Sequence, residues 1–261
     1  MKNYILLTGL ILFSTLNLNS QEILNPAIKA NTAFIAGEKL TYEMHYGLIS
    51  AGKVVLSLHE EKYRGVTVFH SVSLAKTAGL ADKIYGVKDV YESWFYKESN
   101  LPYRHEFSVK EGRFKRNNKV TYNRINNTVE SNLSGIHVVP ELILDLSSIL
   151  YYVRRVDYSK LKVGEVLFLT MYFPDEVFPF RFVYDGKEVI ETKFGEINCI
   201  KLKPVVEVGR MFKNKDDLTM WLSDDGNYIP ILIRLDIRIV GDIDLYLTEY
   251  KNTANPLIFK K

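Results

Sequence analysis

The sequence predicts a mostly β protein: two similar antiparallel β-units, arranged as a sandwich or a half-open barrel and joined by one helix. Three observations lead to this prediction. Short segments with alternating apolar and polar residues, separated by turns rich in Gly, Asn and Asp, fill both halves of the chain, which is the pattern of antiparallel strands. One segment between the halves has helical spacing instead. In addition, a stretch of the first half returns in the second half at a fixed interval.

The returning stretch covers residues 83–95 and appears again at residues 210–222, 127 positions later. The residues that match at this offset, inside and outside the stretch, are Lys88 with Lys215, Asp89 with Asp216, Trp94 with Trp221, Asn100 with Asn227, and Gly37-Glu38 with Gly164-Glu165. A fixed period over much of a chain is typical of a repeated structural unit. We therefore expect residues 37–134 and 164–250 to form equivalent β-units that pack together as one domain.

The N-terminus has the pattern of a signal peptide. Lys2 precedes an apolar run over residues 4–16, which is too short for a spanning helix, and polar residues follow it. We expect cleavage after Ser20, so that residues 1–20 are not part of the fold. No later stretch reaches the roughly 18 unbroken apolar residues of a transmembrane helix. The sequence thus predicts a periplasmic or otherwise exported protein with no transmembrane span after signal removal.

In the first unit, alternation begins after Gly37-Glu38 and continues through three strands that are separated by glycine turns. A single helical turn over residues 78–85 leads into the strand of residues 90–96. Pro102 stands at the first position of the next strand, where it leaves the hydrogen-bond ladder intact. The remaining strands of this unit are expected at residues 103–109, 120–122 and 128–133.

A linking helix is predicted over residues 141–156. Its apolar positions at helical spacing are Leu146, Ile149, Leu150 and Val153. Asp145 is a suitable N-cap, and Arg154 and Arg155 suit the negative end of the helix dipole. We expect this helix to pack between or across the two units.

The second unit opens at Gly164-Glu165. Residues 166–173 are nearly continuously apolar, so both faces of this strand should be covered, and residues 178–184 alternate before the next turn. The chain's single cysteine, Cys199, excludes a disulfide framework and a thiolate metal site. A long strand is expected over residues 228–240.

Composition and motifs argue against several function classes. The net charge of +3, from 34 basic and 31 acidic residues, is too small for general nucleic-acid binding. The five histidines show no ligand spacing, and neither a nucleophilic serine motif nor a phosphate-binding glycine loop is present. The sequence therefore predicts no metal, no cofactor and no catalytic residue. Residues 110–119 carry five basic side chains that could meet anionic lipid or glycan, although a solvated hairpin tip is the simpler interpretation.

Several motifs resemble an exported bacterial family known as domain-of-unknown-function family 3108. They are G-E-K-L-T-Y-E-M-H-Y-G from Gly37, D-V-Y-E-S from Asp89, L-P-Y-R from Leu101, L-Y-Y-V-R from Leu150, C-I-K-L-K-P from Cys199, and W-L-S-D-D-G-N-Y-I-P from Trp221. The resemblance spans nearly the whole mature chain in the right order. It implies an envelope location and a β-rich fold, and it brings no reaction with it. In general layout the chain is also similar to the half-barrel lipoprotein carriers of the periplasm, which is an analogy of fold and not of function.

The predicted repeat also separates scaffold from candidate site. Residues shared by both copies would serve the same role twice, which indicates a structural role. A polar site on one copy is expected where the copies differ. The candidate ligand-binding residues on this argument are Tyr91, Glu92, Arg104 and His105, which face Leu218, Thr219, Ile231 and Leu232 in the sequence alignment.

The function that these observations favour is that of an exported, non-catalytic envelope protein that binds or delivers an apolar or amphipathic envelope component, such as lipid or glycan. Two alternatives stay open at this stage. The first is a hydrolase or lyase acting on envelope glycan or lipid, with carboxylates that the fold brings together. The second is a scaffold of an envelope complex, marked by a large exposed apolar patch.

Overall fold

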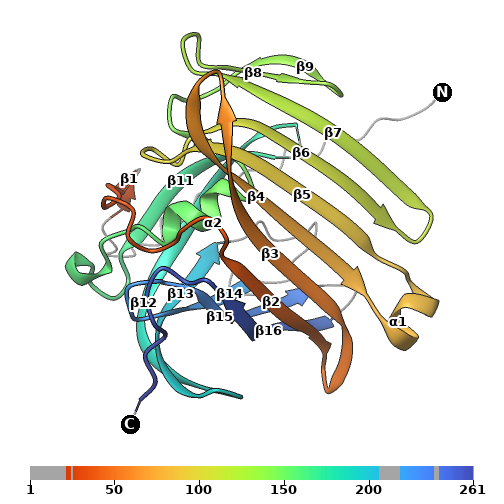
Figure 1. The fold of residues 1–261 in the computed structure, drawn as a ribbon, viewed down its shortest axis with the longest axis vertical. Helices are drawn as coiled ribbons and strands as arrows, with labels where there is room; N and C mark the ends of the chain where they lie inside the picture. Colours follow the sequence, from red (N-terminus) through yellow and green to blue (C-terminus); the bar gives the residue numbers. More distant parts are fainter. Residues whose placement is uncertain (1–21, 25, 174, 206–217, 238–240, 261) are drawn as a thin grey trace, which may run out of the picture.

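The computed structural model describes residues 22–24, 26–173, 175–205, 218–237 and 241–260. The fold is mostly β, as predicted, and its strands form one 16-stranded sheet in the order β1-β11-β12-β13-β14-β15-β16-β2-β3-β4-β5-β6-β7-β8-β9, with β10 also paired to β11. Figure 1 shows this sheet curving around the short helix α2 (Ser148–Val153). The architecture is thus an open, barrel-like sheet and not a sandwich of two sheets.

Two antiparallel meanders of six strands each make up most of the sheet. The first meander is β2 (Lys39–Tyr46), β3 (Ile49–Tyr63), β4 (Val66–Thr77), β5 (Lys88–Tyr96), β6 (Pro102–Glu111) and β7 (Phe114–Asn123). The second is β11 (Val166–Tyr172), β12 (Val177–Thr192), β13 (Gly195–Val205), β14 (Leu218–Ser223), β15 (Pro230–Ile237) and β16 (Gly241–Lys251). The other elements are β1 (Glu22–Leu24), β8 (Thr128–Ser131), β9 (Gly135–Val138), β10 (Ile143–Leu144) and the 3-10 turn Tyr158–Lys160. Antiparallel pairing of β16 with β2 joins the meanders into one sheet.

The two meanders share a bulge and a hydrogen bond at equivalent places. Trp94 lies on β5 and Trp221 on β14, the fourth strand of each meander, and in both the pairing with the next strand shifts directly after the tryptophan. The indole N–H of Trp94 donates to Glu61 and that of Trp221 donates to Glu188, each at 2.9 Å. The two glutamates are themselves 127 positions apart. The offset seen in the sequence therefore relates side chains that do the same structural work.

The helix expected over residues 141–156 is much shorter in the structure. Ile143 and Leu144 form β10 and pair in parallel with β11, because the free edge of that strand offers partners for their backbone groups. The N-cap position of α2 is Ser147 and not the predicted Asp145, but the Oδ1 of Asp145 accepts hydrogen bonds from the amides of Ser147 and Ser148 at 2.8 Å. These are amides that a helix start leaves without an intrahelical partner.

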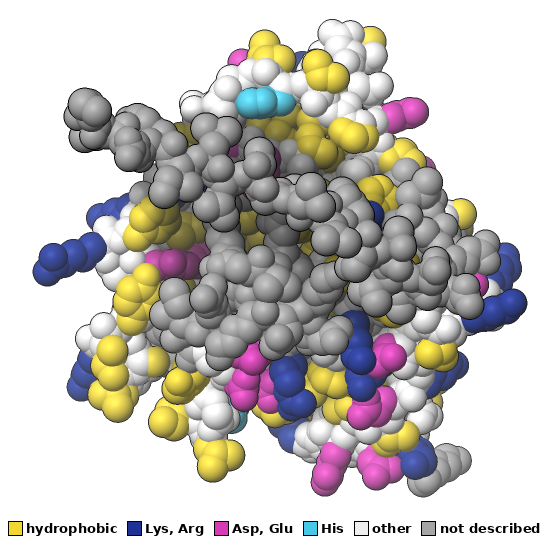
Figure 2. Space-filling model, turned by 180° about the vertical axis from the view of Figure 1, so that it is seen from behind, with side chains coloured by type: hydrophobic (Ala, Val, Ile, Leu, Met, Phe, Trp, Pro, Cys, Tyr) yellow, Lys and Arg dark blue, Asp and Glu magenta, His cyan; other side chains and the backbone are white. Residues whose placement is uncertain are grey.

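Three connections of the first meander meet at one end of the sheet, which we call the α1 end (residues 46–53, 76–88 and 109–116). They are the β2–β3 turn, the β6–β7 turn and α1 (Gly79–Ile84), which fulfils the predicted helical turn. The amide of Gly112 donates to the carbonyl of Gly86, and the amide of Ala78 donates to that of Ala51, at 2.8 and 2.9 Å. This end lies at the lower right of Figure 1 and at the lower left of Figure 2, where hydrophobic side chains project from the surface.

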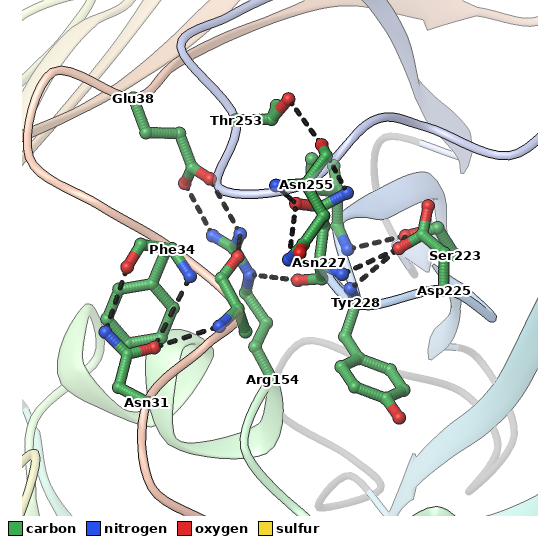
Figure 3. A network of polar contacts seen from close by, with 12 residues as sticks. Asn31, Phe34, Glu38, Arg154, Ser223, Asp225, Asn227, Tyr228, Thr253 and Asn255 are labelled. Atoms are coloured by element: carbon green, nitrogen blue, oxygen red, sulfur yellow. Dashed lines mark hydrogen bonds and ion pairs between the residues drawn. The ribbon is translucent and has the colours of Figure 1, made fainter.

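Arg154, directly after α2, ties three parts of the chain together (Figure 3). Its guanidinium forms a bidentate ion pair with Glu38, at 2.6 and 2.7 Å, and both side chains are 1% exposed. It also donates to the backbone carbonyls of Ala33 and Asn227, at 3.0 Å each. The segment before β2, the end of α2 and the β14–β15 turn are therefore held by one buried side chain.

The next residue, Arg155, makes the corresponding contact with the first meander. It donates to the carbonyls of Lys29 and Glu98, at 2.9 and 2.8 Å, and to the side-chain oxygen of Asn100. Asn100 and Asn227 are both fully buried and stand in the turn after the tryptophan strand of their own meander. Two neighbouring arginines thus fix the end of α2 to equivalent turns of both meanders.

The largest hydrophobic cluster lies between α2 and the second meander. Buried members from α2 and the strands are Leu144, Ile149, Tyr152, Val153, Leu167, Leu169, Met171, Phe182, Tyr184, Ile200, Leu202, Met220 and Leu222. In the described part of the chain, neither helix has the length and apolar character needed to cross a bilayer.

Candidate functional site

The face of the sheet that is turned toward α2, called the inner face, differs sharply between the two meanders. Cross-strand pairing places Ser71, Ser93 and His105 side by side on β4, β5 and β6. The corresponding row on β13, β14 and β15 is Leu202, Met220 and Ile233. Leu202 and Met220 pack in the cluster beside α2, whereas Ser93 donates a hydrogen bond to the Asp145 carboxylate. One inner face is polar where the other is apolar.

A cavity of about 70 Å³ lies between the inner face of β3–β5 and the segment that includes α2. Its lining residues are Leu56, Ser71, Val72, Ser73, Tyr91, Leu146, Ser147, Leu150 and Tyr151. The volume is comparable to that of about two water molecules in the liquid, at roughly 30 Å³ each. The lining mixes hydroxyl groups with leucine side chains, which suits one end of an amphipathic molecule.

On the inner face of β4, β6 and β7, three buried side chains have polar atoms without a well-formed hydrogen bond to any described residue. They are the Ser71 hydroxyl, the Tyr122 hydroxyl and the ring nitrogens of His105, for which a loose contact with the backbone of Glu92 is the sole hydrogen-bonding contact among the described residues. A buried polar group without a partner costs about 1–3 kcal/mol of stability. An apolar row like that of the second meander would avoid this cost. Of these groups the Ser71 hydroxyl lines the cavity, so it is the natural contact for a polar group that enters there.

Burial, with a smaller contribution from the Asp145 carboxylate, shifts the pKa values of His105 and Tyr122. Burial lowers the pKa of His105, and the smaller effect of the Asp145 carboxylate opposes this shift. Burial also raises the pKa of Tyr122 well above its usual value, and the charge of Asp145 adds to that shift. The His105 imidazole is thus neutral at pH 7 and presents one donor and one acceptor nitrogen.

A carboxyl pair, Asp89 and Glu111, lies at the border of the α1 end, to which Glu111 belongs. The two carboxyl groups share a hydrogen bond, and burial raises the pKa of both. The Asp89 carboxylate also accepts from the amide of Lys110 at 2.9 Å. Burial, aided by the charges of this pair, raises the pKa of Tyr91 to about 12. Sequence reasoning set Asp89 aside as scaffold and missed Glu111, because only the register of β5 and β6 brings them together.

The structure does not gather the four predicted site residues into one site. Tyr91 lines the inner cavity, and His105 is buried on the same face. Glu92 and Arg104 lie on the opposite face, because neighbouring residues of a strand point in opposite directions. There Glu92 contacts the Nε2 of His70 at 2.9 Å, and Arg104 lies over the Trp94 ring and pairs with Glu106.

The counterparts that the sequence alignment assigned to Arg104 and His105 are also shifted by one residue. Pairing with the tryptophan strands aligns Arg104 with Leu232 and His105 with Ile233. The shift arises in the turn before the fifth strand, which is one residue longer in the second meander. In this corrected alignment the first meander still has a polar residue where the second has an apolar one, both on the outer face (Arg104 and Leu232) and on the inner face (His105 and Ile233).

Comparison with known proteins gives a family and a fold. The family model "Protein of unknown function (DUF3108)" matches residues 41–248 and confirms the resemblance drawn from the motifs. No curated protein matches the chain. A similar solved structure is that of a "Beta-barrel-like Protein of Domain of Unknown Function DUF1849 from Brucella abortus", at 8% identity and a TM-score of 0.54, covering 87% of this chain and 99% of that chain. At this identity the likeness concerns the fold alone.

Proposed function

The chain belongs to the DUF3108 family, whose description names no activity, and we propose its function from the inner face. It is an exported, non-catalytic protein that binds an amphipathic component of the envelope, either a lipid or a glycan. The polar end of that ligand occupies the cavity beside α2. Export rests on the signal-peptide pattern of residues 1–20, which lie outside the described residues.

One observation carries this proposal: the row Ser71, Ser93 and His105 replaces an apolar row of the same sheet position. Both rows face the core, so packing alone would favour apolar side chains in each. The polar row leaves the Ser71 hydroxyl without a partner among the described residues and gives the buried His105 imidazole a loose backbone contact with Glu92 alone, which lowers the stability of the empty protein. Such a feature is explained by a bound polar group that restores the missing hydrogen bonds.

The test is capture of the natural ligand by protein purified from its exported fraction. Native mass spectrometry and solvent extraction should reveal a bound amphipathic molecule. Ser71→Leu copies the second meander and fills the cavity, so the bound fraction should fall at least about tenfold, as loss of a buried polar contact predicts. Ser108→Leu makes the same change at an exposed position of β6 and should retain the ligand.

Two outcomes would count against binding at this cavity. One is purified protein that carries no ligand and binds none from an envelope extract. The other is Ser71→Leu protein that retains the ligand as fully as the Ser108→Leu control.

A hydrolase is the second candidate, favoured by the Asp89–Glu111 pair. Two carboxyl groups that share a proton can supply a general acid and a general base. The same capture experiment separates the two functions. A binding protein returns the ligand intact, whereas a hydrolase returns cleavage products that disappear in Glu111→Gln protein.

A further inference from the structure

The α1 end carries exposed apolar side chains that contribute nothing to the core. Helix α1 has no buried residue at all. The exposed fractions are 66% for Leu80, 76% for Ile84, 53% for Tyr85 and 54% for Phe114, while Leu48 at the β2–β3 turn is fully exposed. Isolated exposed apolar residues are ordinary, but a group of them on adjoining projections marks a binding surface.

Basic side chains surround these residues. Residues 46–53, 76–88 and 109–116 contain eight Lys or Arg and two Asp or Glu, a net charge of +6, against +3 for the whole chain. Lys83, Lys88, Lys110, Arg113 and Lys115 form no ion pair with any described residue, whereas Arg116 pairs with Asp175. Asp236 and Asp242 border the β2–β3 turn, so the basic surface is strongest around α1 and the β6–β7 turn. These charges are free to act on a partner.

We propose that the α1 end docks on the surface of an anionic phospholipid bilayer. Ile84, Tyr85 and Phe114 would enter the boundary between headgroups and acyl chains, and the lysines and arginines around them would contact the phosphate groups. This combination of projecting apolar residues with a basic rim is how peripheral proteins bind membranes. A nucleic acid would satisfy the charges and leave the apolar side chains in water. This docking is independent of the ligand in the cavity beside α2.

Vesicle co-sedimentation tests the proposal, with protein collected in its exported form so that the apolar run of residues 4–16 is absent. The protein should sediment with vesicles containing phosphatidylglycerol and much less with phosphatidylcholine alone. Binding should weaken as salt is raised, because screening shortens the reach of the charges. The double variant Lys83→Glu with Arg113→Glu should bind at least about tenfold more weakly. So should Ile84→Ser with Phe114→Ser, since it removes the apolar anchors.

Matched controls lie at the opposite end of the sheet. Ile125, in the β7–β8 turn, is 93% exposed, so Ile125→Ser removes an apolar residue that is even more exposed than Ile84. Lys62→Glu with Lys193→Glu reverses two charges near the β3–β4 and β12–β13 turns. Both controls should bind vesicles like the native protein. An environment-sensitive dye should shift its emission on Ile84→Cys and not on Ile125→Cys, because Cys199 is buried and does not compete for labelling.

The proposal is overturned if native protein stays in the supernatant with anionic vesicles at low salt. It is equally overturned if neutral vesicles bind the protein as well as anionic ones, or if the control variants lose binding as much as the α1-end variants. A dye shift at Ile125→Cys equal to that at Ile84→Cys would also contradict it.

Discussion

The two meanders have the same strand order and the same supporting contacts, yet their inner faces differ in chemistry. Each has a tryptophan on its fourth strand that donates to a glutamate, and each has a buried asparagine that an arginine from the end of α2 reaches. The row beside α2, in contrast, is Ser71, Ser93 and His105 in one and Leu202, Met220 and Ile233 in the other.

This difference separates the residues that stabilise the fold from the residues that form the candidate site. The contacts that both meanders share are the tryptophan–glutamate hydrogen bond beside the bulge and the arginine contact with the asparagine turn. The second meander supplies the apolar surface on which α2 packs. The first leaves hydroxyl groups, an imidazole and a small cavity on the same side of the sheet. The likeness therefore identifies scaffold, and the contrast identifies the candidate site.

The largest expected effects are at Arg154 and Arg155, which attach the end of α2 to the two meanders. Arg154→Ala leaves the Glu38 carboxylate buried without its partner, and we expect unfolding free energy to fall by about 3–5 kcal/mol. Arg155 donates mainly to neutral carbonyl groups, so Arg155→Ala should cost less, about 1–3 kcal/mol. Denaturant unfolding of both variants measures the difference.

A paired replacement serves as the control for Arg154. Glu38→Leu with Arg154→Met removes both charges, so it should be milder than Arg154→Ala, because no charge is left buried alone. An Arg154→Ala protein that is as stable as the Arg155→Ala protein would contradict the assignment of the buried ion pair as the main anchor.

The mostly β fold follows from local alternation and turn residues, both visible in the sequence. The union of the meanders into one sheet does not, because β16 and β2 pair over about 200 residues and neither strand carries a local signal for its partner. The helix was predicted too long for a related reason: Ile143 and Leu144 fit a helix by spacing, but the edge of β11 competes for their backbone.

The candidate site was predictable only in part. Comparing the copies directed attention to β5 and β6, where Tyr91 and His105 face the interior. It also selected Glu92 and Arg104, which face outward, since a difference between copies does not say which face a residue occupies. The sequence did not predict Ser71 as a site residue, because only the pairing register of β4, β5 and β6 places it beside Ser93 and His105.

Replacing Trp94 or Trp221 tests whether the two meanders are equivalent, with a smaller expected loss of unfolding free energy than at Arg154. Trp94→Phe and Trp221→Phe each remove one indole N–H that donates to a carboxylate, and each should lower the unfolding free energy by about 1–3 kcal/mol. If both serve as scaffold, the two losses should agree within about 1 kcal/mol. Thermal and denaturant unfolding test this, and a silent change at one tryptophan beside a large loss at the other would show that their roles differ.

The smallest expected effect is at His105, and it depends on pH. Because burial lowers the pKa of His105, the unfolded chain binds a proton near pH 6.5 while the folded protein does not. The native protein should therefore lose stability as pH falls from about 7 toward the lowered pKa, by at most about 1.4 kcal/mol per pH unit from this group. His105→Ile copies the second meander, so it should remove this loss.

Two variants separate the charge of His105 from its missing hydrogen bonds. His105→Ile removes the buried imidazole, whose nitrogens lack well-formed hydrogen bonds, and should leave stability at pH 7.5 unchanged or raised by up to about 2 kcal/mol. His105→Gln also cannot titrate in this range, so it should remove the pH-dependent loss, but it keeps a buried polar group and should gain no stability at pH 7.5. Denaturant unfolding at pH 7.5 and 5.5 measures both quantities. If His105→Ile instead loses several kcal/mol at pH 7.5, the imidazole is hydrogen-bonded in the native protein, and the apolar row of the second meander is no guide to the first.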